Sequence, residues 1–424
     1  MEKRDLWNGI RENSLIKTLT DLKGNPRVLV FIEPLWGIPY NLIAPFTTIY
    51  MRALGVGYIQ IGILLSVSML VQVFSASFAG IITDKLGRKK TTQFGDFFGW
   101  VIPCLIWAFA QNFWFFLAAM TLNSFEQVNQ TSWHCLMVED AEKKDTLHIY
   151  TWVTIAGLAA VFFAPISGAL IPVFSSVVPI MRVLYFIFAV AMLAKNLITW
   201  RFTKETQRGR IRMEETRSVS VRKMISEYGS LIPRIFRNRE MVSTLGITVI
   251  LLITGMINGN FFALFVSEDL QIPENFLAYF PIFRAAVMLL FMFALQHKLA
   301  ALKMQIPMCA GFVFYIAAQL ILITGPVKSP LFILFVTLLE AVAIALVGPR
   351  KDSMLILFID EAERARIMSF MCAIGIAFTT PFGYLAGFLF SLNRCFPFLL
   401  SACLYSLAFF IILRFRETSE KSSD

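Results

Sequence analysis

The sequence predicts an all-helical integral membrane protein whose twelve transmembrane helices form two pseudo-symmetric six-helix bundles. Three observations predict this fold: the overall hydropathy, the number of long apolar runs, and the position of one long polar stretch. Of the 424 residues, 57% are hydrophobic and 16% are charged, and the mean hydropathy is +0.68. A domain with a water-facing surface does not tolerate so apolar a composition.

Apolar runs of about 18 residues or more are long enough to cross a bilayer as helices. The runs are 28–51, 58–82, 93–110, 113–138, 149–171, 178–200, 241–266, 276–296, 305–325, 330–357, 367–391 and 396–413. The polar stretch separates six runs from six. We therefore expect the following organisation: an N-terminal segment over 1–27, a bundle over 28–200, a middle loop over 201–240, a second bundle over 241–413, and a tail over 414–424.

Basic residues give the expected orientation. Most of the 38 Lys and Arg residues lie in the two terminal segments, the middle loop and the loops that alternating spans place on the same face. Basic loops stay in the cytoplasm, so both termini are expected to be cytoplasmic, in a multi-pass protein of the plasma or inner cell membrane. The opposite face carries only Arg52, Arg182, Lys328 and Arg394. The net charge of +10 then indicates contact with anionic lipid headgroups of the bilayer, and no nucleic-acid partner is expected.

The N-terminal segment 1–27 lacks the apolar core and cleavage site of a signal peptide. Leu15, Leu19 and Leu22 share one face of a helical pattern that Gly24 ends. This pattern predicts either a helix lying in the membrane interface or a packing helix on the cytoplasmic side.

The loop between the second and third runs concentrates glycine and charge, as residues 80–92 read G-I-I-T-D-K-L-G-R-K-K-T-T. Gly87 suits a tight turn, and Gly80 allows a neighbouring helix to approach closely. Asp84 can lie against a helix N-terminus, where the helix dipole favours an anion. Arg88 and the lysines beside it hold the loop in the cytoplasm.

This pattern resembles the signature loop of the major facilitator superfamily of secondary transporters, which reads roughly G-x-x-x-D-[RK]-x-G-[RK]-[RK]-[RK]. The resemblance implies the two-bundle fold, transport by alternating access, and a cytoplasmic gate formed by Gly80, Asp84, Gly87 and Arg88. In the family, the residues corresponding to Asp84 and Arg88 latch helix ends in one state of the cycle. An ordinary charged membrane loop is the alternative interpretation.

Three short echoes indicate that the two halves are duplicated. Residues 201–206 resemble 414–418, residues 41–46 resemble 260–265, and the acidic segment 139–142 resembles 360–363. Halves related in this way place a substrate site between them, near the middle of the membrane.

Charged residues inside apolar runs are costly and therefore indicate function. They are Glu33, Glu126, Lys195, Arg284 and Glu340. Glu126 and Glu340 lie near the middle of the corresponding fourth and tenth runs, and the duplication places them to face each other across a cavity. An apolar cavity disfavours the ionised carboxyl, which suits it to carry a proton. Proton coupling is assigned first to Glu126 and second to Glu340, although either can instead be the structural partner of Arg284 or Lys195.

The other charged residues have two interpretations each. Glu33 lies near the start of the first run and is the third candidate for proton coupling; it is expected either in the cytoplasmic vestibule or only extended toward the membrane surface. Arg284 can clamp an anionic substrate or pair with Glu340. Lys195 is expected to extend toward the membrane surface.

Neutral polar residues gather in the first, fourth and seventh runs. In the family, spans one, four, seven and ten line the cavity, so these residues are candidates for substrate binding. The full candidate set is Tyr40, Asn41, Asn123, Glu126, Gln127, Gln130, Asn258, Asn260, Arg284 and Glu340. For any single residue, hydrogen bonding between helices is the alternative.

The fifth run resembles the motif of proton-driven drug antiporters, about G-x-x-x-G-P-x-x-G-G. Its helix-packing residues are Ala164, Pro165 and Gly168, which predict a kinked helix packed tightly on its neighbour. Exporters also commonly carry an arginine in span four, and residues 122–130 contain none.

The predicted function is secondary active transport by alternating access, with proton-coupled efflux of small amphipathic compounds preferred. The 42 Phe and 8 Trp residues suit an aromatic cavity for such compounds. The first alternative is a proton-coupled symporter for uptake of a sugar, organic acid or other small nutrient. The second is a membrane receptor on the same fold that transports nothing. A contact between Arg284 and a bound anion favours uptake, whereas a site centred on Glu126 and lined by Phe favours export.

No enzyme is expected, because H-E-x-x-H, G-x-x-x-x-G-K-[ST] and G-x-S-x-G are all absent from the sequence. The six cysteines are scattered singly, so neither a metal site nor a disulfide framework is predicted. The expected partners are a small-molecule substrate, protons and the lipid bilayer, with no cofactor, and the protein is expected to be a monomer.

Overall fold

The computed structural model describes residues 22–174, 176–217, 236–294, 302–357 and 364–415, which are helical with no strand among them. These residues form two compact units: Met1–Gly57 with Val67–Ile225, and Tyr58–Ser66 with Ser226–Asp424. The predicted N-terminal helix around Leu15 and Leu19 lies outside the described residues. So do much of the middle loop and most of the tail.

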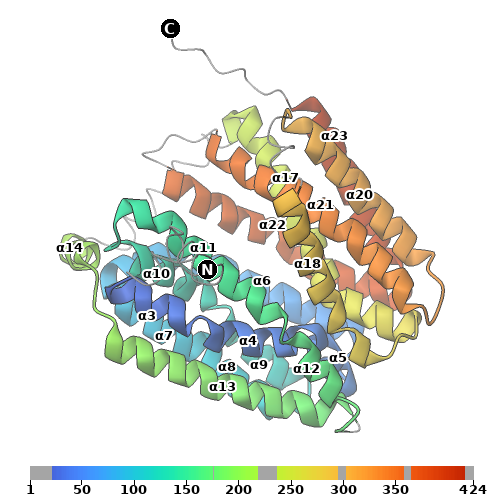
Figure 1. Ribbon diagram of the computed structural model, residues 1–424, viewed down its shortest axis with the longest axis horizontal. Coiled ribbons are helices and arrows are strands. Elements are labelled where there is room, and N and C mark those ends of the chain that lie inside the picture. The colour runs from blue at the N-terminus through green and yellow to red at the C-terminus, as the bar shows by residue number, and fades with distance from the viewer. Residues whose placement is uncertain (1–21, 175, 218–235, 295–301, 358–363, 416–424) are drawn as a thin grey trace, which may run out of the picture. The chain divides into compact units, whose positions relative to one another are not determined.

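The first unit contains the helices that precede the middle loop and one helix, α14, from the beginning of that loop. They are α3 (Gly24–Ile32), α4 (Pro34–Ile43), η1 (Ala44–Phe46), α5 (Thr47–Ala53), most of α6 (Tyr58–Leu86), α7 (Arg88–Asp96), η2 (Phe97–Val101), α8 (Ile102–Ala108), α9 (Phe113–Asn123), α10 (Glu126–Val138), α11 (Lys143–Val161), α12 (Ala164–Leu170), α13 (Val177–Phe202) and α14 (Gln207–Thr216). The long helix α13 packs along α4 and α8 (Figure 1).

The second unit contains the remaining helices. They are α17 (Arg239–Leu264), η3 (Phe265–Asp269), η4 (Glu274–Phe276), α18 (Tyr279–Ala294), α20 (Gln305–Ile323), α21 (Pro330–Leu357), α22 (Arg364–Leu392) and α23 (Phe396–Arg414). Helix α20 packs between α21 and α23, where the rings of Tyr315 and Tyr405 stack with their centroids 4.3 Å apart. The beginning of α6 belongs to this unit and packs closely on α22, because Gly62 lies against the backbone of Gly383 and Gly387.

Ten helices of the described chain are long and apolar enough to cross a membrane, and each overlaps one of the predicted runs. The other two predicted runs, 93–110 and 113–138, are also helical through most of their length. Both are interrupted by polar residues, among them Asp96 in the third run and Glu126 in the fourth. The all-helical membrane fold is therefore confirmed.

Proline residues divide several of the crossing segments. Pro34 opens α4 directly after α3, and Pro165 lies in the first turn of α12, two residues after the break from α11. Proline has no N–H to donate and clashes with the preceding turn, so a continuous helix is interrupted there. The kink predicted in the fifth run is present, and Ala164, Ser167 and Gly168 are buried as α12 packs on α4.

Small residues bring the helices of the first unit close together. A Cβ on Gly95 of α7 would lie 2.5 Å from the Cβ of Asn129 on α10, and one on Gly37 of α4 would lie 3.1 Å from the Cβ of Ala160 on α11. Neither position has room for a larger residue without a shift of the neighbouring helix. These two contacts fix α4, α7, α10 and α11 around the site described next.

Candidate functional site

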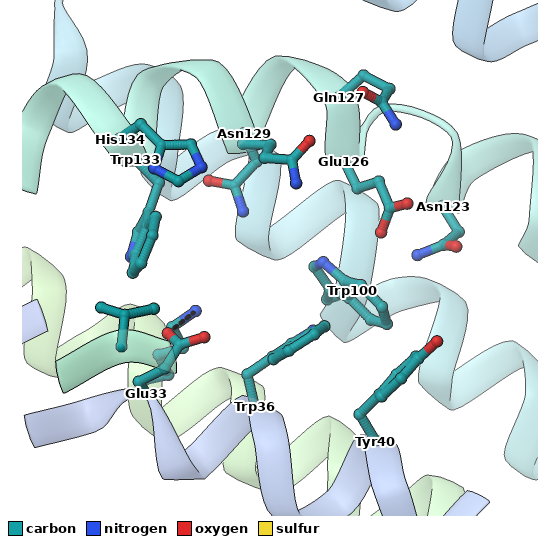
Figure 2. A pocket seen from close by; sticks show the side chains of 13 residues that line it. Glu33, Trp36, Tyr40, Trp100, Asn123, Glu126, Gln127, Asn129, Trp133 and His134 are labelled. Atoms are coloured by element: carbon teal, nitrogen blue, oxygen red, sulfur yellow. Dashed lines mark ion pairs between the residues drawn. The ribbon is translucent and has the colours of Figure 1, made fainter. Parts of the chain in front are cut away.

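A cavity of about 420 Å³ lies within the first unit (Figure 2). Its lining residues come from α4 and the residue before it, η2, α9, α10, α11 and α13, and polar and aromatic side chains dominate them. They are Glu33, Trp36, Tyr40, Trp100, Asn123, Glu126, Gln127, Asn129, Gln130, Trp133, His134, Val153 and Lys195. The structure thus brings together six of the predicted site residues, namely Glu33, Tyr40, Asn123, Glu126, Gln127 and Gln130.

Glu126 owes its position to a break in the fourth predicted span. Helix α9 ends at Asn123, and α10 begins at Glu126, so the carboxyl stands in the first turn of α10, where the helix dipole favours an anion. Irregular backbone at membrane depth is tolerated where it is buried in protein or lines a cavity. Figure 2 shows the carboxylate pointing into the cavity toward Tyr40 and Trp100. Among the described residues, no side chain forms an ion pair or hydrogen bond with it.

The opposite wall is also built on an irregular helix. Trp100 lies in the π-helical turn η2, and Pro103 follows in α8. Pro103 has no N–H to offer the carbonyl of Gly99, four residues earlier. The side-chain amide of Asn123 donates a hydrogen bond of 2.7 Å to that carbonyl. Asn123 is therefore a structural link between α9 and η2 as well as a lining residue.

Three aromatic rings face Glu126. Trp36 and Tyr40, one turn apart on α4, stack with centroids 4.9 Å apart and planes 14° apart. Trp100 stands edge-on to both, with its centroid 5.8 Å from Trp36 and 6.3 Å from Tyr40. Only Tyr40 of these three was predicted from the sequence, although the spacing of Trp36 and Tyr40 places them on one helical face. The cavity is aromatic, but its described aromatic residues are Trp and Tyr, so the Phe lining that would favour export is not found among them.

The prediction that Lys195 extends toward the membrane surface is wrong. Its side chain is 5% exposed, and its ammonium lies 3.8 Å from the carboxylate of Glu33 and 5.8 Å from the centroid of the Trp133 ring. The alternative that Glu33 only extends toward the membrane surface is not what the structure contains, since its side chain is 12% exposed and lines the cavity. Lys195 of α13 thus contacts Glu33, which lies between α3 and α4, and Trp133 of α10.

Asp96 is a further buried acid that the sequence analysis missed. It ends α7, is fully buried, and accepts a hydrogen bond of 2.7 Å from the amide of Asn129. Asp96 could have been predicted on the same ground as Glu33, namely a charged residue inside an apolar run, because the third predicted run begins at residue 93.

In the second unit, a separate buried cluster surrounds Glu340 of α21, which is 3% exposed. Arg284 of α18 pairs with it at 2.7 Å, so the pairing alternative for Arg284 is the one the structure contains. The amides of Asn258 and Gln319 donate to the other oxygen at 3.1 and 3.3 Å. Two other candidates lie apart from this cluster. Asn260 bonds to the backbone of its own helix in this unit, as Asn41 does in the first.

The Gly80–Thr92 loop, which runs from α6 into α7, is held by a charge network within the first unit. Gly87 has φ of 87°, so the tight turn predicted there is confirmed. Arg88 is 4% exposed and binds Glu139 at 2.9 Å and Asp84 at 3.0 Å. Burial opposes its charge, but the contacts with these two carboxylates outweigh burial and raise the pKa of Arg88.

The segment after α13 completes this network, which the sequence analysis did not foresee. Arg212 of α14 binds Asp84 at 2.7 Å. The acid at the N-terminus of α7 is Glu205 rather than Asp84, because the Glu205 carboxylate accepts from the backbone N–H groups of Arg88 and Lys89 at 2.9 and 3.0 Å. The beginning of the predicted middle loop is therefore a packed part of the first unit.

The sequence pattern described as the Major Facilitator Superfamily matches residues 35–371, so the chain belongs to this family. An uncharacterised MFS-type transporter, YqjV of Bacillus subtilis strain 168, is 27% identical over 30% of this chain and 32% of its own length. A protein named multidrug resistance protein MdtG, from Yersinia enterocolitica, is 25% identical over 40% of this chain and 41% of its own. The matches thus span well under half of these curated relatives.

Solved structures show the same fold. The nucleoside transporter NupG superposes with a TM-score of 0.69 at 16% identity, covering 93% of this chain and 100% of that one. The peptide transporter POT, in complex with sulfate, superposes with a TM-score of 0.68 at 13% identity, covering 92% and 93%. The expectation of this family from the Gly80–Thr92 loop is confirmed.

Proposed function

We propose that this protein is a secondary active transporter that works by alternating access and exports small amphipathic compounds in exchange for protons. The observation that carries the proposal is the Glu126 carboxyl, which points into a cavity and has no ion pair or hydrogen bond from the described side chains. Such a carboxyl can take up and release a proton without breaking a structural contact. A carboxyl inside a membrane protein is costly, and function is the usual reason for its presence.

The cavity supports the choice of substrate. Aromatic rings on one wall and the side chains of Gln127 and Gln130 on another suit molecules with both apolar and polar parts. Relatives named multidrug resistance proteins agree with this choice. A contact between Arg284 and a bound anion would favour uptake. The Arg284 guanidinium instead pairs with the carboxylate of Glu340.

The proposed roles follow from these contacts. Glu126 is the proton site, and Tyr40, Asn123, Gln127 and Gln130 contact substrate. Glu33 and Glu340 were the other proton-coupling candidates, and their ion pairs favour structural roles. Whether Glu126 and Glu340 face each other across a central cavity concerns the two units together and stays a prediction.

The proposed location is the plasma or inner cell membrane, with both termini cytoplasmic and the protein monomeric. The charge of the basic loops supports this orientation. The Gly80–Thr92 loop would then form part of a cytoplasmic gate, in which Arg212 and Glu205 assist Asp84 and Arg88.

Purified protein in liposomes under an imposed pH gradient tests the function. Pooled dyes, drugs, sugars and organic acids are offered, and Glu126→Gln is compared with Glu214→Gln, which alters an exposed carboxyl. We expect the substrate to accumulate against the proton flow. Glu126→Gln should abolish this accumulation, and Glu214→Gln should not. Accumulation with the proton flow would identify a symporter instead. Full proton dependence in Glu126→Gln would remove Glu126 from the mechanism, and a complete lack of movement would favour the receptor alternative.

A further inference from the structure

The cavity contains two places where a carboxylate lies beside aromatic rings. At the first, the ammonium of Lys195 lies 3.8 Å from Glu33 and 5.8 Å from the Trp133 ring centroid. The protein thus already holds one cation between a carboxylate and a tryptophan inside this cavity. A cation over the face of an aromatic ring is attracted by the negative charge of the ring face, most strongly for tryptophan and away from water.

The second place repeats this chemistry with more rings. Trp36 and Tyr40 stack on one another, Trp100 stands nearly perpendicular to both, and Glu126 points toward them (Figure 2). We call these four residues the aromatic box. Tyr40 is 38% exposed, so its ring remains open to a ligand. Lys195 is the one lysine or arginine among the described lining residues, and it is already paired with Glu33.

The charges of the cavity favour a positive ligand. When ionised, Glu33 is neutralised by Lys195, whereas Glu126 has no counter-charge among the described residues. The buried Asp96 accepts a hydrogen bond from Asn129, and when ionised it would add further negative charge near the cavity. An anion would meet Glu126 directly and would find no unpaired lysine or arginine on the described lining.

We propose that the aromatic box binds the head of an organic cation, such as a quaternary or protonated ammonium group. The rings would surround the ammonium group, Glu126 would supply the counter-charge, and the amides of Gln127 and Gln130 would lie beside the remainder of the molecule. A cavity of about 420 Å³ suits a small ligand. As a substrate class this inference rests on the proposed transport function, but binding at the box does not.

Binding is measured by calorimetry on the purified full-length protein at neutral pH, with no ion gradient. The probe is phenyltrimethylammonium, and the control ligand is tert-butylbenzene, which has the same shape without the charge. We expect the cation to bind at least about tenfold more tightly than the neutral compound. Equal binding of the two would overturn the proposal, because the site would then recognise apolar shape alone.

Variants locate the binding in the box. Tyr40→Leu and Glu126→Gln are each expected to weaken binding of the cation about tenfold, whereas Tyr40→Phe keeps the ring and should change it less than about threefold. Trp36→Leu is compared with Trp114→Leu, which removes a tryptophan that is 69% exposed. Unchanged binding in Tyr40→Leu and Glu126→Gln would overturn the proposal. Size-exclusion chromatography and circular dichroism verify that each variant is folded, and the Tyr40 pair decides the matter if Glu126→Gln is not.

The binding and liposome measurements together distinguish failure of the aromatic box from failure of transport. Binding of the cation at the box without movement in liposomes would refute transport and leave the box intact. Proton-driven movement of neutral compounds by a protein that does not bind phenyltrimethylammonium would refute the box and leave transport intact.

Discussion

Glu126 and Glu340 occupy corresponding places in the two halves of the sequence, but their surroundings differ. Glu340 accepts contacts from Arg284, Asn258 and Gln319 and is 3% exposed. Glu126 stands at the start of a helix beside a cavity, with aromatic rings opposite and no bonded side chain among the described residues. One acid is therefore bound into the core of its unit, while the other is available to a ligand or a proton.

The position of a charged residue within a membrane span therefore does not by itself indicate the role of that residue. Removal of one partner of a buried ion pair is strongly destabilising, because it leaves the other charge buried without compensation. An acid that has no partner loses nothing when it is neutralised. The change in the free energy of unfolding on substitution therefore distinguishes structural acids from functional ones.

Arg284→Leu is expected to destabilise the protein most, by about 3 kcal/mol, because it leaves the buried Glu340 without its counter-charge. Unfolding in mixed detergent micelles measures the change. The double variant Arg284→Leu/Glu340→Leu should recover most of the loss. A single variant as stable as the parent would show that Glu340 does not need this pair.

Lys195→Met is expected to cost about 2 kcal/mol in the same assay, because Glu33 would lose its partner while still largely buried. The matched variant is Lys204→Met, at an exposed position, which should stay within about 0.5 kcal/mol of the parent. Equal effects at the two positions would contradict a structural role for the Glu33 pair.

Glu205→Ala is expected to cost about 1 kcal/mol, since its carboxylate caps the backbone N–H groups of Arg88 and Lys89 at the start of α7. Thermal unfolding followed by tryptophan fluorescence measures the shift. Glu214→Ala, on the exposed surface of the neighbouring α14, is the control. The cap assignment fails if both variants unfold at the same temperature.

Glu126→Gln is expected to have the smallest effect, within about 0.5 kcal/mol of the parent at neutral pH, because no bonded side-chain partner among the described residues is lost. The unfolding assay is the same as for Arg284→Leu. A loss as large as that of Arg284→Leu would show that Glu126 is a structural acid like Glu340, and the contrast between the two units would disappear.

Part of the candidate site was predictable from local patterns. Tyr40, Asn123, Gln127 and Gln130 were found because they are polar residues in apolar runs, and all four line the cavity. Trp36 and Trp100 were missed because tryptophan is common in apolar helices and their grouping arises only when α4 packs near η2. Asn41 and Asn260 do not line this cavity, and each amide donates a hydrogen bond to its own helix, so their contact with a substrate stays a prediction.

By itself, the sequence determined the class of protein, its family and most of its helices. Apolar length is a local property, and in lipid the backbone must satisfy its own hydrogen bonds, so such runs can form only helices or closed barrels. Tertiary structure decided which charges are paired. Glu33 meets Lys195, Arg284 meets Glu340, and Glu205 reaches α7 across large separations in the chain. Those contacts depend on how the helices pack, and so does the cavity that Glu126 faces.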